Sequence, residues 1–257
     1  MTATDHFSAG RLRAAIDTQL DTVEATPADH AARLLLFELL AFAGDLDRAR
    51  RHLDRLHAVE PLQRALDAED HRRAVFAGRR SPRCLGAAPD HLLLRLEALP
   101  YLARGEHAEA RRRLDEANGI PTAAGTLNGA PTAGLCDADE RFGTVLEVFA
   151  PGGAYSWVPL EQVESIAMAP ARATRDALWR PARLSLVDGP EVDVLLPTLY
   201  PGTHEHPDDE VRLGRTTEWI GADGECARGV GGRVFLSESA VVRFADVTSL
   251  KRPARGL

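Results

Sequence analysis

Two histidines near residue 205 form the one cluster in the sequence that has metal-ligand character. His204 and His206 are separated by a single residue and are followed by Asp208 and Asp209. On a strand this spacing would direct both imidazoles to one face, and a carboxylate would complete a site for a metal-dependent hydrolase. The surrounding proline, glycine and acidic residues favour a solvated loop instead. The hydrolase is therefore an alternative that rests on this cluster alone, and we assign no metal ligand.

The sequence contains no pattern typical of nucleophilic catalysis. The G-x-S-x-G pattern that exposes a serine on a strained turn is absent. Cys136 lies beside Asp137 and Asp139, whose negative charges would raise the pKa of its thiol and reduce its reactivity. With Cys84 and Cys226 it makes an odd, widely spaced set that predicts neither a disulfide framework nor a zinc site. We expect no catalytic residue and no cofactor.

Large aromatic residues and arginines in the second half form the candidate binding set. Trp, Tyr and Arg dominate the energetics of protein interfaces, so a group of them could take a partner helix or strand. The set consists of Trp157, Trp179, Arg180, Tyr200, Arg212, Arg215 and Trp219. For any single member the commoner role is structural, because tryptophan readily fills a small β-core and arginine satisfies buried carboxylates.

Composition narrows the class of protein. The chain has 257 residues, 27% of them charged, and a formal net charge of −7. This balance gives no general electrostatic reason to bind nucleic acid or an anionic membrane. The first residues lack the basic start and apolar run of a signal peptide, and no apolar stretch approaches membrane-spanning length. We expect a cytoplasmic protein.

The secondary structure that must position these residues is predicted to change from helices to strands near the middle of the chain. Residues 7–117 show apolar side chains at helical spacing. A buried helix through 34–42 is predicted to begin at Thr26 as N-cap with Pro27 in the first helical position, and to end at Gly44. Asp45 then opens the next helix, which stops before Pro61, and a further helix is predicted around 62–76.

One helix-turn-helix pattern occurs twice in this half. It consists of an apolar residue, a glycine four positions later, an alanine five further on and a leucine after four more. It begins at Leu40 and again at Tyr101, an offset of 61 residues. A glycine in the turn and a small residue at the helix crossing are typical of tetratricopeptide (TPR) repeats, which recur every 34 residues. The helical half is therefore predicted to be TPR-like.

The second half favours strands. Paired segments joined by short turns predict β-hairpins, and the sheet should be mainly antiparallel. The predicted strands are 143–149 with 155–159, 163–168, 182–187 with 191–196, and 233–236 with 240–244, with one helical turn at 174–179. The glycines at 221, 224, 229, 231 and 232 predict a flexible loop. The prediction is an α+β protein with a helical domain at 1–120, a linker at 121–137 and a β-rich domain at 138–257.

Five strings in the second half carry a family resemblance. They are DERFG at 139–143, YSWVP at 155–159, LWRPA at 178–182, LYPG at 199–202 and RLGRTTEW at 212–219. These strings occur in this order after a TPR-like helical half, and together they resemble the ImpE/TagJ (SciE-type) family of type VI secretion accessory proteins. The resemblance covers most of the chain and is strongest between residues 139 and 219.

The resemblance implies a cytoplasmic, non-enzymatic adaptor. Such a protein would bind a component of the contractile sheath, its small subunit, and would link that subunit to the ClpV-type ATPase. Two alternatives come from the residues: the metal-dependent hydrolase at His204 and His206, and a TPR-type regulatory module unrelated to secretion. Either half could contact the partner, and the helical faces could also pair two copies of the chain.

Overall fold

Helices make up most of the first 118 residues. A computed structural model describes residues 1–119, 124–187, 189–221 and 225–252. The helices are α1 (Ala3–Ser8), α2 (Leu12–Ala25), α3 (His30–Phe42), α4 (Leu46–Leu53), α5 (Glu60–Phe76), α6 (Asp90–Ala103) and α7 (His107–Asn118). No helix among these described residues is long and apolar enough to cross a membrane.

The predicted start of the long buried helix was wrong by one short turn. Asp29, not Thr26, caps α3, and its carboxylate accepts a hydrogen bond from the Ala32 N–H at 2.9 Å. Thr26 instead follows α2, where its hydroxyl donates to the Thr22 carbonyl. A carboxylate satisfies a free amide at a helix start as well as a hydroxyl does, so two candidate caps three residues apart compete. Asp45 caps α4 as predicted.

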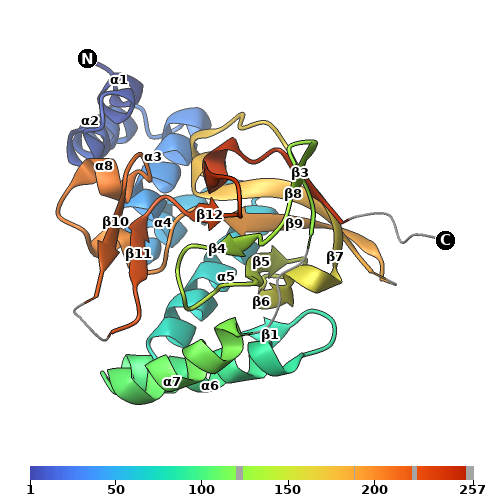
Figure 1. The fold of residues 1–257 in the computed structure, drawn as a ribbon. Coiled ribbons are helices and arrows are strands. Elements are labelled where there is room, and N and C mark those ends of the chain that lie inside the picture. The colour runs from blue at the N-terminus through green and yellow to red at the C-terminus, as the bar shows by residue number, and fades with distance from the viewer. Residues whose placement is uncertain (120–123, 188, 222–224, 253–257) are drawn as a thin grey trace.

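The two copies of the repeated pattern form equivalent helix pairs, α3–α4 and α6–α7. Gly44 and Gly105 adopt φ values of +78° and +74° in the two turns, a region that glycine enters without steric cost. Ala49 and Ala110 are fully buried at the corresponding places in the second helix of each pair. The two pairs lie on opposite sides of α5 in Figure 1.

The strands build one large sheet and two small ones. After β1 (Arg83–Cys84) they are β2 (Gly125–Leu127), β3 (Ala130–Thr132), β4 (Cys136–Asp137), β5 (Val145–Ala150), β6 (Ala154–Pro159), β7 (Val163–Met168), β8 (Trp179–Leu186), β9 (Glu191–Pro197), β10 (Thr217–Ile220), β11 (Arg228–Gly231), β12 (Val234–Leu236), β13 (Val241–Arg243) and β14 (Ser249–Lys251). The large sheet has the order β1-β6-β5-β9-β8-β7-β14-β2-β3, and the small ones are β10-β11 and β13-β12-β4. Among the described residues, the strand pairs of the large sheet are antiparallel except for β1 with β6, which is parallel.

The hairpins predicted from short turns are confirmed. They are β5–β6, β8–β9 and β12–β13, and the predicted helical turn is a 3-10 helix at Thr174–Ala177. The flexible loop predicted from glycines was wrong for Gly229 and Gly231, which lie in β11. A side chain at Gly229 would overlap the Tyr200 ring, so close packing requires glycine there. Gly224 lies outside the described residues.

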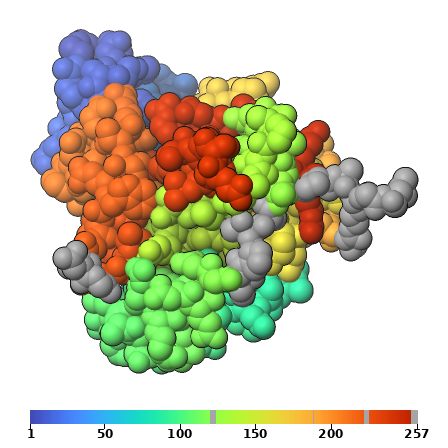
Figure 2. Space-filling view, viewed as in Figure 1, coloured from blue at the N-terminus to red at the C-terminus, as the bar shows by residue number. Residues whose placement is uncertain are grey.

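The large sheet separates two hydrophobic cores. One lies between the sheet and the helices, where residues such as Leu36 and Leu66 pack with Phe149 and Trp157. The other lies on the opposite face, against β12 and the 3-10 helix Phe244–Asp246. Figure 2 shows C-terminal segments, in orange and red, packed between helices of the N-terminal half. The first core therefore joins residues from both predicted domains. Within the predicted linker, β2, β3 and β4 occupy described positions, and residues 121–123 lie outside the described part.

Candidate functional site: an apolar groove beside helix α5

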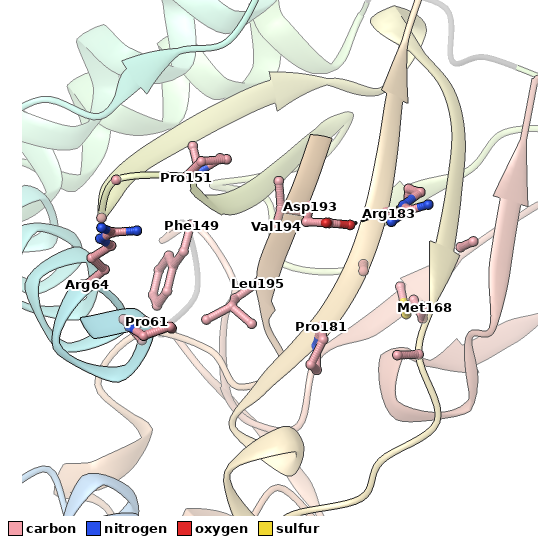
Figure 3. Close-up of a pocket in the computed structure, with 17 residues that line it drawn as sticks. Pro61, Arg64, Phe149, Pro151, Met168, Pro181, Arg183, Asp193, Val194 and Leu195 are labelled. Atoms are coloured by element: carbon pink, nitrogen blue, oxygen red, sulfur yellow. Dashed lines mark hydrogen bonds and ion pairs between the residues drawn. The ribbon is translucent and has the colours of Figure 1, made fainter. Parts of the chain in front are cut away.

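A groove of about 610 Å³ opens where the helix layer leaves the large sheet uncovered. Its floor crosses four neighbouring strands, because Phe149 on β5 pairs with Leu195 on β9, which pairs with Pro181 on β8. The Ala169 N–H donates to the Pro181 carbonyl and continues the row beyond β7. Alternate residues of a strand face the same side, so this register places the side chains in one surface (Figure 3). The floor is therefore set by sheet geometry.

The first turn of α5 and the β5–β6 turn form one wall of the groove. Pro61 and Arg64 line it from α5, and Pro151, Gly152 and Gly153 line it from the turn. Gly153 has a φ of +81°, and a side chain there would press against the Arg64 backbone at about 3.0 Å. The close approach of turn and helix thus requires glycine, and it fixes the height of this wall.

The lining suits binding of an apolar segment. Most lining residues are apolar, and the charged ones are Arg64, Arg183 and Asp193. Arg183 and Asp193 lie beside each other in Figure 3, and the Arg183 Nε donates to an Asp193 carboxylate oxygen at 3.1 Å. Pockets of this type bind ligands through apolar contact, while a few polar groups set orientation.

A buried ionic network holds α5 against the sheet. Glu147 on β5 is fully buried and accepts two hydrogen bonds from Arg72 of α5, at 2.7 and 2.8 Å. Arg233 donates to the same carboxylate at 2.7 Å, and the Tyr155 hydroxyl donates at 2.5 Å. Burial by itself raises the pKa of Glu147, but the charges of Arg72 and Arg233 outweigh it, so the pKa is lowered.

Asp137 and the DERFG string that follows it at 139–143 extend this network, and the Asp139 N–H donates to the Asp137 carboxylate at 2.9 Å. Arg233 also donates to Asp137, at 3.0 and 2.5 Å. Asp139 accepts from the Arg141 side chain and from the Gly229 N–H, which ties β11 to the same centre. Burial raises the pKa of Asp137 even though Arg233 lies beside it. Residues far apart in the chain therefore meet in one buried charged cluster.

Three members of the predicted binding set lie inside the protein. Trp157, Trp179 and Tyr200 are 0%, 2% and 1% exposed. The Trp157 indole donates to the Tyr155 hydroxyl, and the Tyr200 hydroxyl donates to Asp137 at 2.8 Å. These side chains cannot touch a partner at the surface of this structure, and they instead support the groove floor and the ionic network.

The other four members lie at or near the surface. Arg180 is partly exposed and donates to the Ala169 carbonyl, and Arg212 pairs with Asp209. Arg215 donates to the carbonyls of Phe7 and Ser8 and so attaches α1 to the rest of the chain; these carbonyls end the short helix. Trp219 is 46% exposed on β10. The structure brings Arg180 and Arg215 to one cavity and leaves Trp219 on a separate ribbon.

The two histidines face different neighbours. The His204 ring packs on Gly44, where a side chain would collide with it, and the His206 ring lies 3.2 Å from a Glu218 carboxylate oxygen. Burial lowers the pKa of His204. In residues 1–119, 124–187, 189–221 and 225–252, no group of three or more His, Cys, Asp or Glu side chains is placed to hold a metal ion.

The residues that line the groove were not predicted from the sequence. One available signal was the segment VLEVFA at 145–150, which is apolar on both faces and so predicts cover on both sides. Its single charge, Glu147, indicated a buried partner on another element. The register that aligns Phe149, Leu195 and Pro181 had no comparable local signal.

Comparison with known proteins shows which family this chain belongs to. The family model described as ImpE protein matches residues 129–251. The chain is 36% identical over 260 residues to the type VI secretion system accessory component TagJ of Pseudomonas aeruginosa, covering 97% of this chain and 90% of that protein. The chain belongs to the ImpE/TagJ family. The crystal structure of protein VPA1032 from Vibrio parahaemolyticus shares the fold, with a TM-score of 0.88 at 21% identity, covering 98% and 97% of the two chains.

Membership in the ImpE/TagJ family confirms the resemblance carried by the five strings. All five lie within the matched residues 129–251. Four of them provide the buried residues Asp139, Trp157, Trp179 and Tyr200, so much of this sequence pattern specifies the core. The match identifies this chain as a relative of a type VI secretion accessory component.

Proposed function

We propose that this chain is a non-enzymatic, cytoplasmic adaptor of a type VI secretion system. In this proposal the groove beside α5 holds a segment of the small subunit of the contractile sheath. The bound adaptor then links that subunit to the ClpV-type ATPase. The observation that carries the proposal is a preformed apolar floor of four strands in a member of the ImpE/TagJ family.

The groove is a better candidate than the helix pairs. We infer that the α3–α4 and α6–α7 pairs are TPR-like in their turn glycines and buried alanines. TPR arrays bind partners on a concave surface made by stacked pairs. Here α5 intervenes between the two pairs, whereas the groove floor is continuous across four strands.

A pull-down with one groove variant tests the proposal. Ala167 is exposed and lines the groove, so Ala167→Arg places a long charged side chain there without disturbing a buried residue. Ala28→Arg is the matched control, because Ala28 is an exposed alanine that does not line the groove. Tagged proteins are incubated with lysate of the source organism expressing its sheath, and bound proteins are identified by mass spectrometry.

The two parts of the proposal fail in different ways. Recovery of the small sheath subunit by the natural chain and Ala28→Arg, with loss in Ala167→Arg, supports both. Equal recovery by all three proteins contradicts the groove as the contact surface. Recovery of no sheath component by any of them contradicts the adaptor function itself.

A further inference from the structure

A second cavity, of about 340 Å³, lies near the junction of β8, α8 (Asp209–Arg212) and the 3-10 helix Phe244–Asp246. Arg180 follows Trp179 on β8, so its side chain leaves the strand on the face opposite the groove floor. The residues that line the cavity include Arg180, Arg215, Arg233, Arg243, Thr198 and Thr217. Its volume is at the small end of the range for pockets that bind small molecules.

The lining carries positive charge and no negative charge. Four arginines contribute to it, and none of the lining residues is Asp or Glu. Three arginines have carboxylate partners outside the lining: Arg215 pairs with Glu210, Arg243 with Asp246, and Arg233 belongs to the buried network. Within the described part of the chain, Arg180 has no carboxylate at ion-pair distance.

The Arg180 guanidinium also has an unused donor. One terminal nitrogen donates to the Ala169 carbonyl at 3.1 Å. Its Nε is buried and has no hydrogen-bond partner. The protein therefore satisfies this guanidinium only in part. Within the described residues its other terminal nitrogen makes no hydrogen bond, and a ligand oxygen in the cavity would accept one from it.

Arg215, which lines the same cavity, could also donate hydrogen bonds to a ligand oxygen. Arg215 is anchored by the Phe7 and Ser8 carbonyls, which hold its charge at the cavity wall. The hydroxyls of Thr198 and Thr217 already donate to backbone carbonyls, at 2.6 Å each, so Arg180 and Arg215 carry the recognition. The planar donor fork of arginine matches the oxygen pairs of carboxylate and phosphate groups.

We propose that this cavity binds a compact oxyanion, a carboxylate or phosphate group, with Arg180 as its main ligand. The site is distinct from the groove, because the two share none of their lining residues. The oxyanion pairs with the one lining arginine that lacks an internal carboxylate. Two sources present this chemistry, a free small anion or an acidic side chain of a peptide.

Calorimetric titration of the purified full-length chain tests the site. The probes are inorganic phosphate and an acetylated triglutamate peptide, both in low-salt buffer. Arg180→Gln removes the charge and the donor fork, and should weaken binding about tenfold or more. Arg112→Gln is the control, because Arg112 is an exposed arginine of α7 that lies outside the cavity. Circular dichroism verifies that each variant is folded.

The expected result is saturable binding of phosphate, the peptide or both, with equal affinity in the natural chain and Arg112→Gln and loss in Arg180→Gln. Phosphate binding assigns the oxyanion to a free small anion, and binding of the peptide alone assigns it to an acidic side chain. Absence of saturable binding of both probes overturns the proposal, as does equal affinity in Arg180→Gln. No sheath protein is present, so the result is independent of the adaptor function.

Discussion

Replacement of Arg72 by methionine should strongly destabilise the protein. Arg72 is 4% exposed and donates twice to Glu147 and once to the Leu199 carbonyl, all at 2.7–2.8 Å. Methionine has a similar length but no charge, so the change removes the ion pair while filling the space. Removal of one partner from a buried ion pair costs about 3–5 kcal/mol, because the remaining charge loses its compensation. Arg233 still contacts Glu147, so we expect the lower part of that range.

Urea unfolding at pH 7, followed by circular dichroism, measures this loss as a fall in the free energy of unfolding. Arg50→Met is the matched control, because Arg50 also contacts two carboxylates, Asp67 and Asp70, but at the surface. Exposed ion pairs contribute about 1 kcal/mol or less. Equal losses in the two variants would refute the conclusion that the buried network holds α5 on the sheet.

The loss of unfolding free energy caused by Arg72→Met should become smaller at acidic pH. The pKa of Glu147 is lowered from its ordinary 4.5 by Arg72 and Arg233, against the effect of burial. A lowered carboxyl pKa adds stability above the unfolded pKa, and this stability is lost as the pH falls through the folded value. The difference in unfolding free energy between the natural chain and Arg72→Met should therefore shrink below pH 4.5. A difference that grows on acidification would contradict the assignment.

Three further predictions concern burial and close packing. Trp179→Ala should lower the free energy of unfolding by about 3–5 kcal/mol, whereas Trp219→Ala, at an exposed position, should change it by less than about 1 kcal/mol; equal losses in urea would contradict their placement. Gly229→Ala should lower the free energy of unfolding by about 1–3 kcal/mol, because the added methyl group would overlap the Tyr200 ring. An unchanged midpoint of urea unfolding would contradict this prediction. Native alkylation at pH 8 should modify exposed Cys84 before Cys226, which is buried and whose pKa burial raises to about 11; mass spectrometry of the products shows the order.

Local elements could be predicted from the sequence because their signals are local. The β8–β9 hairpin follows from two apolar segments that flank the turn residues DGP at 188–190. The α3–α4 turn follows from Gly44, which occupies the left-handed region. Each signal lies within a few residues of the feature it specifies.

Long-range features left no comparable signal. β14 lies between β7 and β2, so strands from near both ends of the second half become neighbours. The buried network likewise joins Arg72, Glu147 and Arg233. Glu147 stands out in its apolar segment, but no local pattern marks the two arginines as its partners. Trp157 and Trp179 stand out by residue type, but residue type alone does not distinguish the buried positions that they occupy from surface positions.

Titration of the purified small sheath subunit into this chain tests the adaptor proposal most directly. We predict saturable binding with a dissociation constant in the micromolar range or tighter, with affinity about tenfold weaker or worse for Ala167→Arg and unchanged for Ala28→Arg. No binding to the natural chain at micromolar concentration would contradict the proposed function, and unchanged affinity in Ala167→Arg would contradict the groove as its site.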